Sequence, residues 1–193
     1  MDTIVEERWR DVRRSRLLEA ATRIFAQVGY EAASVEDIAF EAGVGKPTVY
    51  RYFPGKEALF EAVFGQALDD LEARLDVALN EERPFPQQLG ALIAEIVPTF
   101  RTHFASMRGF NEGETSKRRL FRQRRGRIEA RLRAVIALGQ MEGLARDFDL
   151  EVASRFIIGM IWSGSNSELS DNKAIIDAVT DFTLRGLAPG GVP

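Results

Sequence analysis

Apolar residues recur at helical spacing along most of this chain of 193 residues. The first stripe contains Leu17, Ala21, Ile24, Phe25 and Val28, and Gly29 is expected to stop that helix. Beyond residue 86 no segment alternates between apolar and polar positions as a half-buried strand does. The pattern therefore predicts an all-α fold.

Residues 34–56 contain the signals of two short helices around a tight turn. Ser34 and Asp37 fit a capping box at the start of a helix over 34–42, and Gly43 can end it in the left-handed conformation. Pro47 is tolerated only in a first helical turn, so the second helix begins at residue 45 or 46 and ends near residue 53. The stretch is a predicted helix-turn-helix.

The two faces of this unit differ in chemistry. Apolar positions converge inward from both helices: Ile38, Val44, Val49 and Phe53, with the small Ala39 allowing the helices to cross closely. The outer face of the second helix combines cations, hydroxyls and flat rings: Lys46, Pro47, Thr48, Tyr50, Arg51 and Tyr52. This mixture is typical of DNA-binding surfaces, although packing aromatics on a solvated charged face would give a similar pattern.

A recognition helix that enters the major groove by its N-terminus would bring Lys46 and Pro47 to base edges. Thr48, Tyr50 and Tyr52 could donate hydroxyls to phosphates, and Arg51 could bind guanine or a phosphate. Lys56, at the start of the next helix, is expected at a phosphate. Residues 44–56 carry three cations and no acid in a chain with a net charge of -3.

Residues 13–64 resemble the N-terminal domain of TetR-type transcriptional repressors. The shared elements are Phe-x-x-x-Gly-Tyr, Asp-Ile-Ala, Ala-Gly-Val, Tyr-x-Tyr-Phe and Lys-x-x-Leu. The resemblance implies DNA contacts from the following residues: Ser34, Glu36, Gly45, Lys46, Pro47, Thr48, Tyr50, Arg51, Tyr52 and Lys56. Two positions depart from the common pattern, because Gly45 replaces a frequent polar cap and the acidic Glu36 cannot clamp a phosphate.

Composition limits the remaining possibilities. The net charge of -3 means that DNA affinity must come from clustered cations or from two copies of the chain. With no cysteine there is no disulfide framework and no zinc-thiolate site. No apolar run approaches the ~20 residues that span a bilayer, and the N-terminus does not resemble a signal peptide, so we expect a cytoplasmic protein.

Residues 1–16 form a basic arm that contains Arg8, Arg10, Arg13, Arg14 and Arg16. It could be a flexible segment that reaches the minor groove or flanking phosphates. It could equally be a frayed helix start whose arginines pair with Glu6, Glu7 and Asp11.

A long helix over 56–82 is expected to link two domains: residues 1–55, a three-helix DNA-binding domain, and residues 56–193, a larger helical domain for effector binding and dimerisation. A further helix is predicted to end at about residue 107, and Pro98 should kink or interrupt it. Three more helices are predicted over 116–141, 150–165 and 172–187. The following arginines are expected on a solvated face: Arg119, Arg124, Arg127, Arg131 and Arg133.

Arg125 falls on the apolar stripe of helix 116–141, so it is predicted to point inward and to need an anionic partner. That partner could be Glu95, Glu112 or Glu114, or an effector that is anionic or carries an acyl or aromatic group. The candidate ligand-binding residues are Phe100, His103, Phe104, Met107, Phe121, Arg122, Arg125 and Trp162. His103 is expected to be a pocket wall and not a metal ligand, and no cofactor is predicted.

Helix 150–165 is apolar on nearly every side, which indicates that one face is covered by a second subunit. The candidate dimer-interface residues are Phe156, Gly159, Met160, Ser163, Ile176, Val179, Phe182 and Thr183. An intrachain core is the alternative. The resemblance implies a homodimeric repressor that leaves a palindromic DNA operator when a small molecule binds. A sequestering dimer without operator binding is the second hypothesis, and an enzyme is disfavoured because no catalytic constellation is present.

Overall fold

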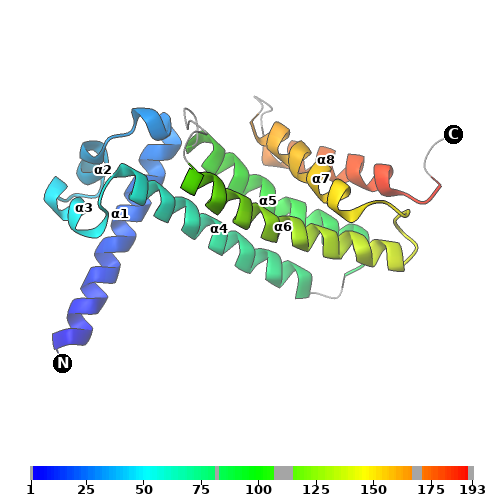
Figure 1. Ribbon diagram of the computed structural model, residues 1–193, viewed down its shortest axis with the longest axis horizontal. Helices are drawn as coiled ribbons and strands as arrows, with labels where there is room; N and C mark the ends of the chain where they lie inside the picture. The colour runs from blue at the N-terminus through cyan, green and yellow to red at the C-terminus, as the bar shows by residue number, and fades with distance from the viewer. Residues whose placement is uncertain (1, 81–82, 107–114, 167–170, 191–193) are drawn as a thin grey trace. The chain divides into compact units, whose positions relative to one another are not determined.

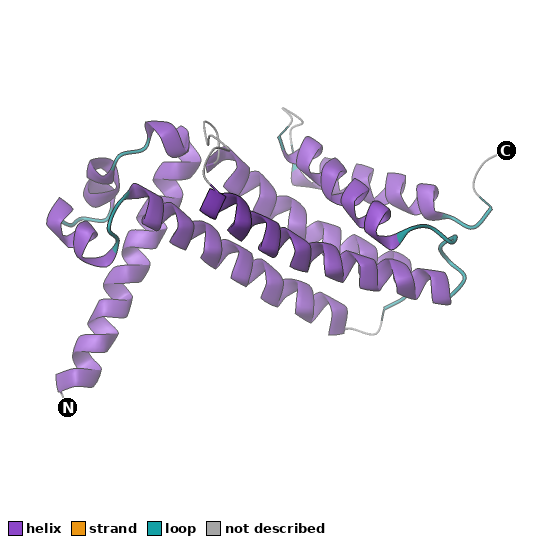
Figure 2. Ribbon diagram, in the orientation of Figure 1, coloured by secondary structure: helices purple, strands orange, loops and turns teal. Residues whose placement is uncertain are grey.

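The computed structural model describes residues 2–80, 83–106, 115–166 and 171–190; side chains are described for 8–79, 83–102, 124–166 and 171–190. Within these ranges the chain forms eight α-helices and no strand, as expected for an all-α fold (Figures 1 and 2). The helices are α1 Asp2–Ala32, α2 Val35–Glu41, α3 Lys46–Tyr52, α4 Lys56–Asn80, α5 Phe85–Ser106, α6 Thr115–Met141, α7 Leu150–Ser165 and α8 Asn172–Leu187.

The chain divides into two compact units, which we call the N-terminal and C-terminal units. The N-terminal unit comprises Met1–Ala67 and Thr102–Gly113, and the C-terminal unit Leu68–Arg101 and Glu114–Pro193. The boundary lies inside α4, whereas the sequence placed the division at residues 55/56. The reason is that the first turns of α4 bury Leu59, Phe60 and Val63 in the same core as α1 to α3.

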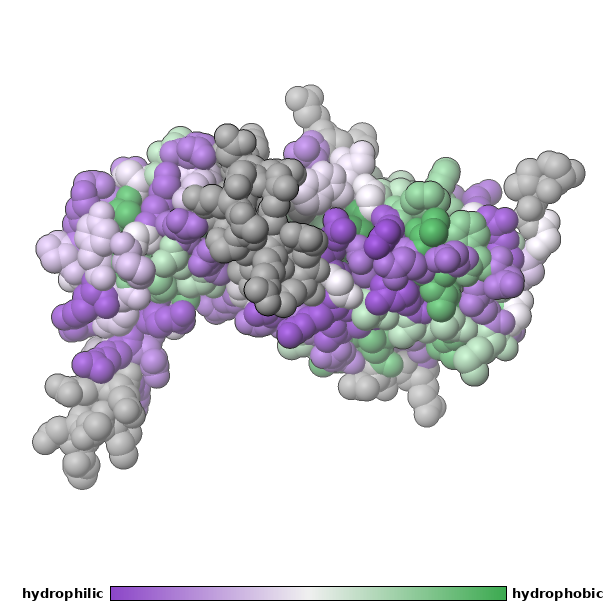
Figure 3. All heavy atoms as spheres, in the orientation of Figure 1, coloured by the Kyte–Doolittle hydropathy of each residue, from purple (hydrophilic) through white to green (hydrophobic). Residues whose placement is uncertain are grey.

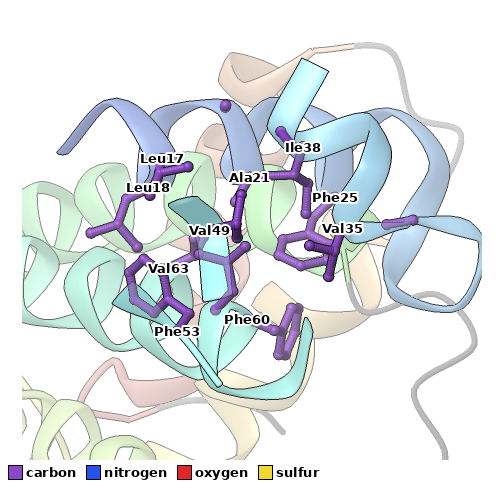
Figure 4. Close-up of a cluster of buried hydrophobic side chains, with 14 residues drawn as sticks. Leu17, Leu18, Ala21, Phe25, Val35, Ile38, Val49, Phe53, Phe60 and Val63 are labelled. Carbon is purple, nitrogen blue, oxygen red and sulfur yellow. The ribbon is translucent and has the colours of Figure 1, made fainter. Parts of the chain in front are cut away.

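One apolar core holds the N-terminal unit together (Figure 4). Its central ring belongs to Phe60, whose centroid lies 5.2 Å from that of Phe25, 4.9 Å from that of Tyr30 and 6.1 Å from that of Phe64. The pairs with Phe25 and Tyr30 are edge-to-face and the pair with Phe64 is stacked, and aromatic pairs of these kinds add about 0.5–1.5 kcal/mol each beyond their buried area. The aromatic cluster therefore fixes α1 against the start of α4.

One expectation for α1 was wrong, because Val28, predicted on the buried stripe, is 51% exposed. Of the two interpretations of the basic arm, the structure agrees with a helix start and not with a flexible segment, since residues 2–16 belong to the helix. The break at Gly29 is confirmed, since its φ of 79° interrupts the helical backbone before one last turn, and such a φ carries no Cβ penalty in glycine.

The C-terminal unit contains the later turns of α4 with α5 to α8, around a second core. Its largest fully buried side chains include Leu71, Leu75, Phe85, Leu89, Leu92, Ile93 and Ile96. Helix α5 continues through Pro98 without interruption, although proline cannot donate a backbone hydrogen bond. The hydroxyl of the next residue, Thr99, donates to the Glu95 carbonyl at 3.2 Å.

Glycine allows close contact at two places in this core. A Cβ atom on Gly139 of α6 would lie 2.6 Å from a ring carbon of Phe85, the first residue of α5. A Cβ atom on Gly164 of α7 would lie 2.9 Å from Ile175 of α8. These distances are shorter than van der Waals contact, so the positions require a residue without a side chain.

We predict that Gly139→Ala lowers the free energy of unfolding by about 1–3 kcal/mol, because the buried Phe85 ring has no space into which it can move. Urea denaturation monitored by circular dichroism measures the change. Gly126→Ala on the same helix is the matched control: its Cβ would meet nothing within 4 Å, and alanine should raise helix stability by up to about 1 kcal/mol. Equal stability of both variants would contradict the packing.

Candidate nucleic-acid interface

Helix α2 begins with the cap that the sequence predicts. The Ser34 Oγ accepts a hydrogen bond from the backbone N–H of Asp37 at 3.0 Å, and donates its own proton to the Asp37 carboxylate at 2.6 Å. The hydroxyl thus satisfies one of the free N–H groups at the helix start while the carboxylate orients the hydroxyl. Since Ser34 is engaged in this cap, any DNA contact it makes has to share the same oxygen.

The turn between α2 and α3 is a Schellman motif. Gly43 has a φ of 67°, its N–H donates to the Phe40 carbonyl at 3.0 Å, and the Val44 N–H donates to the Ala39 carbonyl at 2.9 Å. Helix α3 then begins at Lys46 after Gly45, which provides no side-chain cap. Pro47 lies in the first turn of α3, as expected.

The inner face of the helix-turn-helix is confirmed as core, because Ile38, Val49 and Phe53 are buried and Val44 packs against them (Figure 4). The residues proposed to meet DNA lie on the other side of α3. Gly45, Lys46, Pro47, Tyr50 and Arg51 are exposed, whereas Ser34, Thr48 and Tyr52 are half-buried. Burial of one face of α3 therefore turns its cations and hydroxyls outward.

Two of these exposed cations are held by neighbouring side chains. Lys46 pairs with Glu36 of α2, which places an acid within reach of the start of the recognition helix. The guanidinium of Arg51 lies over the Tyr52 ring, 5.4 Å from its centroid. Both partners of the Lys46–Glu36 pair are solvent-accessible, so the pair contributes at most about 1 kcal/mol and DNA can replace the carboxylate.

Lys56 is placed differently from the other candidates. Its ammonium group donates to three carbonyls at the end of α1, those of Tyr30, Glu31 and Ala33, at 2.9, 3.1 and 3.1 Å. The Nζ atom also lies 4.6 Å from the centroid of the Tyr30 ring. The last carbonyls of a helix lack backbone partners and carry partial negative charge. A lysine supplies both the missing hydrogen-bond donors and a positive charge. All three donors of Lys56 are therefore used inside the protein.

Comparison with known proteins adds independent information. Residues 17–63 match the family described as bacterial regulatory proteins, tetR family, and residues 82–166 match the tetracyclin repressor-like C-terminal domain. The chain belongs to the TetR family of DNA-binding transcriptional regulators. Proteins of this family are regulators and not enzymes.

Relatives of this TetR-family regulator match along nearly the whole chain. The HTH-type transcriptional regulator YhgD of Bacillus subtilis is 26% identical over 186 residues, 91% of this chain and 97% of YhgD. The HTH-type transcriptional repressor NicS of Pseudomonas putida is 27% identical, covering 92% of this chain and 93% of NicS. The structure of FadR from Bacillus subtilis in complex with stearoyl-CoA has a TM-score of 0.77 at 20% identity, over 90% and 98% of the chains, and so shares the fold.

The TetR-family regulator has an ionic ladder between α4 and α6 that the sequence did not reveal. Arg124 pairs with Asp69 and with Glu72 at 3.4 Å, and Arg131 binds the Asp76 carboxylate through two hydrogen bonds of 2.7 and 2.9 Å. The hydrogen bonds from Arg131 lower the pKa of Asp76. The hydrogen bond to Asp69 raises the pKa of Arg124. On the face seen in Figure 3, hydrophilic residues gather over α6.

This ladder corrects the expected solvated arginine face, because Arg124 and Arg131 are mostly buried between charged partners. Arg127, although more exposed, also pairs with Glu72, at 3.3 Å. Spacing along α6 shows that the arginines recur on one side of the helix. Spacing does not show which neighbouring helix presents acids at the matching positions. The ion pairs of the ladder could therefore be identified only from the folded structure.

The expected inward position of Arg125 is wrong. Its side chain is 55% exposed and pairs with Glu129, one turn further along α6, at 3.1 Å. Of the acids expected to meet it, Glu95 pairs with Arg74 at 2.8 Å instead, and Glu112 and Glu114 lie outside the described side chains. Position 125 lies one turn before the buried Ile128 and Glu129, but its long side chain extends to solvent.

Most of the other predicted ligand-binding residues lie outside the described side chains: His103, Phe104, Met107, Phe121 and Arg122. Phe100 is buried in α5, whereas Trp162 of α7 is exposed. Arg125 and Trp162 are therefore both accessible to solvent in this chain. Among the described residues there is no cluster of His, Cys, Asp or Glu suited to a metal ion, and no helix long and apolar enough to cross a membrane.

The candidate interface residues on α7 and α8 divide into two groups. Phe156, Gly159, Ser163 and Phe182 are exposed, with 64% and 70% of the two phenylalanines accessible, while Met160 and Ile176 are half-buried. Val179 and Thr183 are buried within the C-terminal unit, so they contribute to its core and not to an exposed face. The remaining exposed apolar residues of α7 are Val152 and Trp162.

We predict that Lys56→Met lowers the free energy of unfolding by about 1–3 kcal/mol, because three carbonyls at the end of α1 lose their donor. Thermal and urea unfolding followed by circular dichroism measure the loss. Lys46→Met is the matched control, since an exposed ion pair contributes about 1 kcal/mol or less. If Lys56→Met were as stable as the parent but bound DNA weakly, Lys56 would instead be a phosphate ligand.

Proposed function

We propose that this TetR-family regulator is a homodimeric repressor that binds a palindromic operator and leaves it when a small molecule binds the C-terminal unit. The observation that carries the proposal is the polar face of α3, where Lys46, Tyr50 and Arg51 are exposed above a buried apolar core. A repressor is favoured over an activator because NicS, which matches along most of its length, is a repressor. The regulator would act in the cytoplasm, where bacterial DNA lies.

Each residue on this face has a proposed role. Lys46 and Pro47 would contact base edges, because a recognition helix enters the major groove by its N-terminal residues. Tyr50 and Arg51, one helical turn further, would hold phosphates together with the half-buried Thr48 and Tyr52. Gly45 and the cap at Ser34 would allow the DNA backbone to approach closely. Lys56 is assigned to protein stability and not to this set.

Dimerisation would use the exposed faces of α7 and α8. Phe156 and Phe182 are large apolar side chains whose exposure to water is unfavourable in a monomer. The small Gly159 and Ser163 would let two helices approach closely. Two helices from each protomer would form a four-helix interface. The dimer matters for DNA binding because two recognition helices about one helical turn apart read two half-sites.

The first experiment is fluorescence anisotropy with the DNA immediately upstream of the coding region, at two salt concentrations, with an unrelated duplex as control. Tight and sequence-selective binding that weakens with salt supports the operator-binding function. If neither this DNA nor a genome-wide pull-down yields a selective site, the alternative, a dimer that sequesters a small molecule, takes its place.

The same assay then tests effector release. FadR from Bacillus subtilis was solved with stearoyl-CoA, so long-chain acyl-CoA, the free fatty acid and aromatic acids are suitable probes. A ligand that favours the DNA-free state by about 1–3 kcal/mol weakens operator binding roughly 5–150-fold. Operator affinity that no probe changes would count against these ligand classes.

We predict different effects from two substitutions on α3. Tyr50→Phe should weaken binding to operator and unrelated duplex alike by about 0.5–1.5 kcal/mol, because a phosphate carries no sequence information. Lys46→Ala should relax selectivity at one base position by about 1–3 kcal/mol. Anisotropy titrations against single-base variants of the operator distinguish the two effects. Unchanged affinity in both variants would exclude this docking.

We predict that Phe156→Glu combined with Phe182→Glu converts the dimer into monomers, because charged side chains would be buried without partners. Analytical ultracentrifugation reports the mass, and operator affinity should fall because the half-sites are then bound independently. Met141→Glu is the matched control, since Met141 is an apolar residue of the same unit that is 85% exposed. A dimer that survives the double substitution would place the interface elsewhere.

A further inference from the structure

The first half of α1 carries no core residue over the part whose side chains are described. Residues 8–16 are all exposed, and the buried stripe of the helix begins only at Leu17. In Figure 1 this half of α1 extends away from α2 and α3. We call residues 8–16 the basic extension. A helical segment without apolar packing gains little from folding, so its composition has to be explained by something other than the core.

The composition of the basic extension is strongly one-sided. Five of its nine residues are arginines, and Asp11 is its one acid: Arg8, Arg10, Arg13, Arg14 and Arg16 carry the charge. Within the described side chains, none of these five arginines forms an ion pair, although each described arginine of α6 does. This local net charge of +4, from five arginines and one aspartate, contrasts with -3 for the whole chain.

Arginines in this segment also repel one another. Arg10 is followed by Arg13 and Arg14 three and four positions later, and Arg13 is followed by Arg16, so like charges are neighbours on the helix surface. This repulsion is unfavourable in the free protein and would be relieved by a polyanion along the helix.

One contact ties the basic extension to the recognition helix. The guanidinium of Arg14 lies over the ring of Phe53, 5.5 Å from its centroid, and Phe53 is the residue that caps the C-terminal end of α3. The extension therefore leaves the apolar core of the N-terminal unit beside the end of α3. A duplex held by α3 provides the nearest dense row of anionic groups.

We propose that the basic extension is a second DNA contact, which binds backbone phosphates flanking the bases that α3 reads. This inference rests on the operator-binding function proposed above. Nine helical residues span roughly 13 Å, a length along which one DNA strand presents about four phosphates. Because the arginines point in several directions around the helix, two or three contacts per protomer are expected. They raise affinity without selecting a sequence.

The test compares the salt dependence of DNA binding for the parent and for Arg8→Gln, Arg10→Gln, Arg13→Gln and Arg16→Gln combined, which leaves the Arg14–Phe53 contact in place. The slope of log K against log salt should become shallower by about 2–3 per protomer, since each lost phosphate contact removes about 0.9 from it. Operator and unrelated duplex should weaken by the same factor. Circular dichroism verifies that the variant is folded.

Arg74→Gln with Arg127→Gln is the control, because both are exposed cations of the C-terminal unit that lie on α4 and α6, away from the proposed dimer interface. It should leave the slope unchanged. If the parent binds the operator selectively but the fourfold variant has the same salt slope as the parent, the proposal is overturned. The operator-binding function is then unaffected. An equal change of slope in the control also overturns it, because net charge alone would then be responsible. Absence of selective binding by the parent contradicts the operator function itself.

Discussion

Burial of one face of α2 and α3 is the constraint on which the DNA-binding surface depends. Each helix has seven residues, too few to be stable alone in water. They persist because Ile38, Val49 and Phe53 enter the core that α1 and α4 also form. Once those side chains point inward, helical geometry turns Lys46, Tyr50 and Arg51 outward. The same apolar contacts that stabilise the domain therefore orient its recognition surface.

Local rules in the sequence were sufficient for features whose cause is local. The cap at Ser34, the left-handed Gly43 and the position of Pro47 each depend on a few consecutive residues, and all were predicted correctly. The helix boundaries of the C-terminal unit followed from apolar periodicity in the same way. The resemblance to TetR-type repressors came instead from the motifs of residues 13–64.

Features that depend on a distant partner could not be predicted. In the sequence nothing distinguishes Lys56 from an exposed lysine. Its partners are three carbonyls at the end of α1, which only the fold brings close to it. Arg125 shares a helix face with the buried Ile128 and Leu132, yet its side chain reaches solvent and pairs with Glu129. Arg124 and Arg131 looked solvated because their partners, Asp69 and Asp76, are about 55 residues away in sequence. Charged side chains are long enough to have several possible partners, and only the fold selects one.

The close contact between Gly139 and Phe85 has an evolutionary consequence. The two residues are far apart in sequence, yet the ring of one occupies the space that a side chain of the other would need. Neither position can drift independently: a relative with a larger residue at the position of Gly139 must carry a smaller one at that of Phe85. Paired substitution at these sites would therefore record, within a set of diverging sequences, how closely the start of α5 and the end of α6 are packed.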